Sequence, residues 1–181
     1  MQRERDNTMQ PLKIDSIRYG WFEVSLIGHY MICSNYLDYD TPKKILRAVL
    51  NLLKKKSEEE WICWQDEPGA EIMKLTISED ELEIDVYDSE KTSYELGSAD
   101  TLLKKNRGEH IWSKSIGIPI IVDNLVTEFS LYENGNGLSM YEKNWMEFPQ
   151  KEYDELKAYA YKLSKQRSKN NEYDELFCTT Y

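Results

Sequence analysis

Apolar and polar residues alternate from Tyr19 to Leu26, so that every second side chain is apolar. This period of two is typical of a strand with one buried face. A second strand-like segment runs over 30–36, after a turn at Gly28. The pattern therefore predicts an N-terminal β-hairpin. The polar residues 1–11 are expected to be flexible.

A helical pattern follows the hairpin. Thr41 and Pro42 provide an N-cap and a proline at the first helical position, where its missing N–H costs nothing. Apolar residues then recur on one broad helical face: Ile45, Leu46, Val49, Leu50, Leu52 and Leu53. Lys54–Lys56 complement the negative end of the helix dipole. The spacing in Asp38-Tyr39-Asp40 resembles a metal-binding segment, but acids before a helix are interpreted as structural.

Three short strand-like segments come next, over 60–65, 70–77 and 81–87. The turn residues Pro68-Gly69 and 78–80 separate them, which predicts an antiparallel meander. Two strands have apolar faces that should pack on the helix: Met73, Leu75 and Ile77, and Leu82, Ile84 and Val86. The opposite face then carries Lys74 and Thr76 beside Glu83 and Asp85.

The rest of the chain is mainly helical in pattern. The expected elements are a short helix over 99–107 capped by Ser98, a brief strand near 110–113, and helices over 118–132 and from Pro149 onward. Asn134–Gly137 should stop the helical pattern over 118–132, and 166–181 should be a polar tail. We therefore expect residues 1–181 to be a single α+β domain, with an antiparallel sheet of hairpin and meander packed by three to four helices.

Negative charge is concentrated in the meander. Fourteen Asp and Glu lie between Glu58 and Glu95 against two Lys, whereas the remainder of the chain is close to neutral in a total of −10. Such a field repels phosphate backbones and anionic lipids, so neither nucleic acid nor membrane is an expected partner. It attracts a basic protein surface. The alternative is that the charge only keeps the protein soluble.

The sequence carries no recognisable catalytic, metal or cofactor motif. Cys33, Cys63 and Cys178 are widely spaced and odd in number, which gives neither a disulfide framework nor a zinc knuckle. His29 and His110 are the only imidazoles, and neither lies in a nucleophile–base signature. We expect no cofactor and no enzyme activity. The absence of a signal sequence or a long apolar span predicts a cytoplasmic protein.

A leucine-rich helix end, Val49-Leu50-Asn51-Leu52-Leu53, precedes Trp61-Ile62-Cys63-Trp64-Gln65-Asp66-Glu67-Pro68-Gly69 and then a hairpin. This arrangement over 20–90 resembles the N-terminal half of small bacterial α+β proteins of unassigned function. In size and layout it also resembles the immunity proteins of bacterial toxin systems. The favoured hypothesis is a non-catalytic immunity or inhibitor protein that neutralises a cationic partner such as a toxin. The candidate contacts are Trp64, Asp66, Glu67, Glu81, Glu83, Asp85 and Asp88.

Two other classes of function stay open at this point. The chain could be a structural or assembly subunit, as a homodimer through exposed strands or through its tyrosine-rich last helix. It could also be an enzyme whose active site combines a perturbed carboxyl with His29 or His110. The sequence does not define the oligomeric state.

Overall fold

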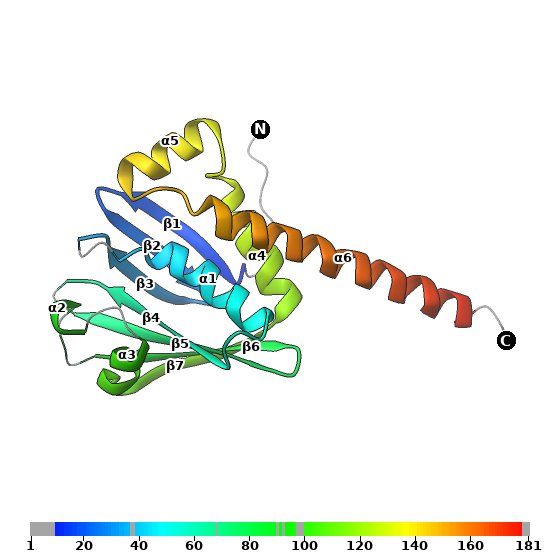
Figure 1. The fold of residues 1–181 in the computed structure, drawn as a ribbon, viewed down its shortest axis with the longest axis horizontal. Helices are drawn as coiled ribbons and strands as arrows, with labels where there is room; N and C mark the ends of the chain where they lie inside the picture. Colours follow the sequence, from blue (N-terminus) through cyan, green and yellow to red (C-terminus); the bar gives the residue numbers. More distant parts are fainter. Residues whose placement is uncertain are drawn as a thin grey trace.

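The computed structural model describes residues 10–36, 39–67, 69–89, 91, 93–96 and 100–178. Its strands form two antiparallel sheets, of three and four strands, accompanied by six helices in the described residues (Figure 1). The α+β fold class is therefore confirmed. The expected single sheet is two sheets, and there are more helices than the three to four expected.

The first sheet has the order β1-β2-β3, with β1 at Leu12–Arg18, β2 at Trp21–Leu26 and β3 at His29–Ser34. The predicted hairpin is β2 and β3. The pattern did not reveal β1, because a register shift between Ile14 and Ser16 interrupts its alternation and turns Ile17 inward instead of Ser16. A β-bulge of this kind breaks the period of two.

The second sheet has the order β4-β5-β6-β7. Its strands are β4 (Glu59–Gln65), β5 (Ala70–Ser78), β6 (Glu81–Asp88) and β7 (His110–Gly117). The predicted meander is confirmed, and the brief strand expected near 110–113 is the start of β7, which pairs with β6. Pro68 lies outside the described residues.

The helices are α1 (Thr41–Leu53), α2 (Ser93–Leu96), α3 (Asp100–Asn106), α4 (Ile118–Ser130), α5 (Gly135–Asn144) and α6 (Gln150–Cys178). The cap of α1 is Asp40 rather than Thr41, since the Asp40 side chain accepts a hydrogen bond from the Lys43 N–H. Helix α4 ends at Ser130, before the predicted stop at Asn134–Gly137, and Asn134 is instead the N-cap residue of α5, which begins at Gly135. Ser98 lies outside the described residues.

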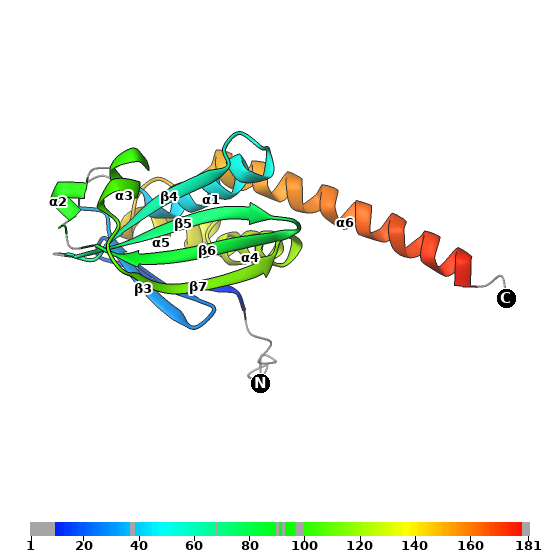
Figure 2. The same cartoon turned by 90° about the horizontal axis from the view of Figure 1, so that it is seen from below.

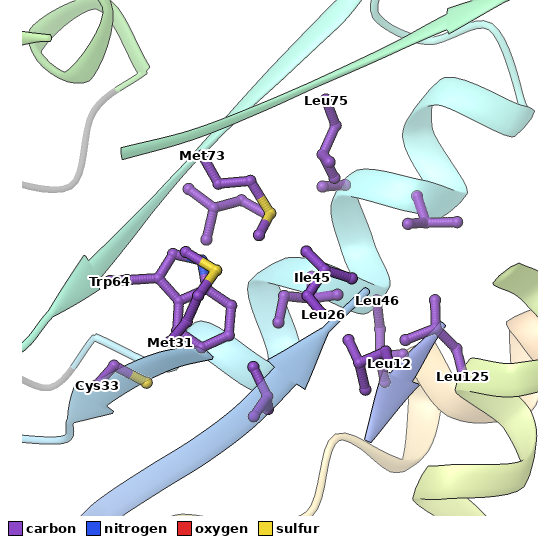
Figure 3. Packing of buried hydrophobic residues seen from close by; sticks show 14 of the residues in the cluster. Leu12, Leu26, Met31, Cys33, Ile45, Leu46, Trp64, Met73, Leu75 and Leu125 are labelled. Atoms are coloured by element: carbon purple, nitrogen blue, oxygen red, sulfur yellow. The ribbon is translucent and has the colours of Figure 1, made fainter. Parts of the chain in front are cut away.

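The core lies where α1 meets both sheets. Figure 3 shows Met31 of the first sheet, Leu46 of α1 and Met73 and Leu75 of the second sheet close to one another. Leu125 of α4 closes the same cluster near Leu12. Each of these side chains is almost fully buried, and each such burial contributes about 1.5–3 kcal/mol relative to exposure.

Helix α6 packs against the body over its first half only. Tyr153 and Leu156 are fully buried, and Glu152 accepts a 2.6 Å hydrogen bond from Arg47 of α1. The helix then projects away from both sheets (Figures 1 and 2). Residues 166–178, which were expected to belong to a polar tail, continue this helix. None of the helices in the described part of the chain combines the length and apolar character that crossing a membrane requires.

Candidate functional site

The outer face of the second sheet points away from α1 and carries the predicted polar residues. Lys74 pairs across the strands with Asp85, and Thr76 pairs with Glu83, as expected. Strand β7 adds Ser113 and Ser115 to the same two rows. This face is only partly open, because α3 packs against β4 and buries Leu103 completely. The exposed acidic strip is therefore narrower than the whole meander.

The carboxylates of this face differ in how far they are neutralised. Asp85 is half-buried and lies 3.6 Å from the Lys74 ammonium and 3.2 Å from Nε2 of His110. Glu83 is exposed and accepts only a hydrogen bond from the Thr76 hydroxyl. Glu81 is exposed as well. Neither Glu81 nor Glu83 forms an ion pair with a described cation.

Three of the other predicted contacts lie at the end of the sheet where β4 joins β5. Burial raises the pKa of the Asp66 carboxyl, a backbone hydrogen bond lowers it, and the negative charge of Asp88 raises it again. Glu67 accepts a 3.1 Å hydrogen bond from the Ser34 hydroxyl of β3. These acids are remote in register from Glu81 and Glu83, since Asp88 is at the opposite end of β6. The predicted contacts thus form two groups and not one surface.

The prediction that Trp64 is part of the contact surface is wrong. Its side chain is 1% exposed, and it lies beside Met31 in the core (Figure 3). Every residue from Trp61 to Gln65 is buried, because α1 lies near one face of β4 and α3 packs on it as well. A buried indole offers no surface to a partner, so Trp64 is a core residue in this fold.

A groove that the sequence pattern did not reveal runs beneath α6. It consists of two adjoining hollows of about 580 Å³ each, which share Asp80, Ile118 and Tyr159. The other apolar lining residues are Leu52, Leu53, Ile77, Pro119 and Leu163. The other acids are Glu58, Glu79 and Glu81, and the cations are Lys55 and Arg167. The sequence feature that could have pointed to this groove is the acidic run 79–81 at the turn between β5 and β6. Glu81 also belongs to β6, so the groove adjoins the outer face of the sheet.

His29 forms the one acid–imidazole pair with a perturbed carboxyl that we find among the described residues. Its Nε2 lies 3.0 Å from Oε2 of Glu71, and its ring stacks on Trp112 at 5.2 Å. Burial raises the pKa of Glu71, while the hydrogen bond and charge of His29 lower it. The pair joins β3 to the second sheet, and the hollows described above are lined by other residues.

The remaining candidate residues are the cysteines and the possible metal ligands. Cys33 and Cys63 are buried, and burial raises the pKa of the Cys63 thiol to about 12, which disfavours the reactive thiolate. Among the described residues, no group of three or more His, Cys, Asp and Glu side chains is arranged to hold a metal ion.

Comparison with protein-family models, with curated proteins and with solved structures found no match to this chain.

Proposed function

We propose that this protein is a non-catalytic binding domain that holds a basic partner protein, most concretely as an immunity or inhibitor protein that neutralises a cationic toxin. Its contact surface is the acidic strip on the outer face of β6, centred on Glu81 and Glu83. The neighbouring Asp85 extends the strip but is already balanced by Lys74 and His110. The second group, Asp66, Glu67 and Asp88, lies at the far end of the sheet and is not part of this surface.

The observation that carries the proposal is the unbalanced charge of Glu81 and Glu83. Both carboxylates are exposed and neither forms an ion pair with a described cation, whereas Glu59 and Asp85 beside them do. The strand backbone is already ordered before binding, so only the freedom of the side chains is lost, and the unbalanced carboxylates attract a basic surface. Their charge would also accelerate association at low ionic strength.

Charge reversal tests the surface. The probes are purified cationic nuclease domains of bacterial toxins, and binding is measured at about 50 mM and about 300 mM NaCl. We expect a probe that binds, more weakly at the higher salt concentration, and a loss of about 100-fold or more in affinity with Glu81→Lys/Glu83→Lys. The matched control, Glu142→Lys/Glu147→Lys, makes the same charge change on exposed residues away from the strip.

The two variants separate a specific surface from net charge. Equal losses in both would mean that only the total charge matters and would remove the strip from the proposal. If none of these nuclease domains binds the protein or is inhibited by it, the toxin-neutralising function is contradicted.

A further inference from the structure

The groove beneath α6 has walls of opposite charge. One wall includes the β5–β6 turn, where Glu79 and Asp80 are exposed, and Glu58 and Lys55 line the same hollow, so this wall is acidic in sum. The other wall is α6, whose Tyr159, Leu163 and Arg167 line the groove. Lys162 lines neither hollow, but it is exposed on α6 three residues after Tyr159 and so lies on an adjacent part of the helix surface.

These opposite charges do not neutralise each other within the chain. Arg167 lines the same hollow as Asp80, yet neither residue forms an ion pair with any described residue. Lys162 and Glu79 likewise form no ion pair in the described part of the chain. The two hollows between these residues have volumes of about 580 Å³ each. The charges of both walls therefore remain available to another molecule.

Helix α6 also lacks support beyond the groove. Leu163 is the last described side chain that packs against the core, and the helix continues to Cys178, about four turns further. Figure 2 shows this part of α6 clear of both sheets. Helices in proteins obtain most of their stability from packing rather than from intrinsic propensity, so such a segment favours a partner along its length.

We propose that a second copy of this chain is that partner. In a two-fold dimer, α6 of each copy lies along the groove of the other. Lys162 and Arg167 of one copy then face Glu79 and Asp80 of the second copy, and the reverse contact forms at the same time. A two-fold interface must be complementary to itself. An acidic wall beside a basic wall meets this condition. Tyr159 and Leu163 supply its apolar centre.

This inference does not rest on the proposed binding of a toxin. The four charged residues of the interface differ from Glu81 and Glu83, but Glu81 also lines the groove, so a dimer would cover part of the acidic strip. A monomeric protein could still bind a basic partner, and a dimer could form in a protein that binds none.

The test uses two variants with opposite charge changes. Glu79→Lys/Asp80→Lys makes both walls basic, and Lys162→Glu/Arg167→Glu makes both walls acidic. All four residues are exposed, and circular dichroism checks that both variants are folded. Sedimentation equilibrium over about 5–200 µM protein measures self-association. We expect a dimer for the unaltered chain and at least about a 100-fold weaker association for each variant alone.

Mixing the two variants decides the question. In the mixed dimer each basic wall meets an acidic wall, so we expect the mixture to regain association to within about 10-fold of the unaltered chain. Glu142→Lys/Glu147→Lys serves as the control and should remain dimeric. An unaltered chain that stays monomeric at the highest concentration would overturn the proposal. So would a dimer that persists in both variants, or a mixture that fails to associate.

Discussion

Asp40 performs two structural tasks with one carboxylate. One oxygen, Oδ1, accepts hydrogen bonds from the Lys43 N–H and from Nε1 of Trp145, each at 3.2 Å. The residue therefore both caps α1 and joins it to the segment between α5 and α6. Burial raises the pKa of this carboxyl, and the hydrogen bonds from Trp145 and Lys43 only partly offset that effect. Folding therefore disfavours the ionised form of Asp40 relative to its protonated form.

The cost at Asp40 predicts a pH dependence. A carboxyl with a raised pKa contributes most to stability below its ordinary value of 3.8, and that contribution is lost as the pH rises through the raised pKa. Asp40→Asn keeps both acceptor bonds but does not ionise. We expect its free energy of unfolding, relative to the unaltered protein, to increase between about pH 3.5 and about pH 7 in urea titrations. Asp40→Ala should lose about 1 kcal/mol or more at every pH. A relative stability of the Asn variant that falls with pH would contradict the assignment.

Trp64 shows the limit of residue-level prediction. The segment Trp61-Ile62-Cys63-Trp64-Gln65 is apolar at successive positions, which indicates burial on both faces, and that signal was present in the sequence. The charge of the neighbouring Asp66 and Glu67 favoured an exposed interpretation instead. Trp64 shares the inner face of β4 with Ile62 and lies beside Met31 of β3, and this contact between the two sheets is not encoded in any local pattern.

Two glycine turns define the first sheet at the scale of elements. Tyr19-Gly20 joins β1 to β2, and Ile27-Gly28 joins β2 to β3. All four residues have positive φ, with values from 46° to 85°. Such turns match the right-handed twist of the strands and favour glycine. The two glycines differ in their surroundings: a Cβ at Gly20 would lie 2.6 Å from Oδ1 of Asn35, whereas nothing lies within 4 Å of one at Gly28.

This difference predicts unequal costs for the same substitution. Gly28→Ala should cost only the backbone strain, about 1 kcal/mol. Gly20→Ala should cost about 2–3 kcal/mol, because the Asn35 side chain is held by a 2.9 Å bond to the Trp145 carbonyl and must move. Chemical unfolding followed by tryptophan fluorescence measures both. Equal losses would mean that the Asn35 side chain yields without cost and that this contact does not hold the turn.

Local periodicity predicted the elements whose contacts are local. Helix α1 and strands β5 and β6 follow directly from spacing, because each has one uninterrupted apolar face, and β4 follows from its apolar run Trp61–Trp64. The missed elements have interrupted patterns: β1 carries a bulge, and α5 has one fully buried residue, Tyr141. The groove could not be predicted in this way. Its walls come from segments near Ser57, Ile77, Ile118 and Tyr159, and no local pattern relates segments that far apart.

At the scale of the whole molecule, acidic and basic charges are separated in space. The meander holds most of the acidic excess, and the stretch of α6 from 157 to 168 carries cations and no carboxylate. A surface of like charges is destabilising through its own repulsion, and the folded protein must offset this with its core. Such a distribution is expected where a surface is retained for association rather than for stability.

Removing charge from the strip should therefore stabilise the protein while it weakens binding. We expect Glu81→Gln/Glu83→Gln to raise the free energy of unfolding by on the order of 0.5 kcal/mol at low salt. The gain should vanish near 1 M NaCl, where the screening length falls to about 3 Å. Glu142→Gln/Glu147→Gln, which removes the same charge elsewhere, should give no such gain in parallel urea titrations at both salt concentrations. If both variants gained equally, the repulsion would be spread over the molecule, and the strip would have no special place in it. A gain confined to Glu81 and Glu83, together with lost affinity for a basic partner, would show that this surface is maintained for binding at the expense of stability.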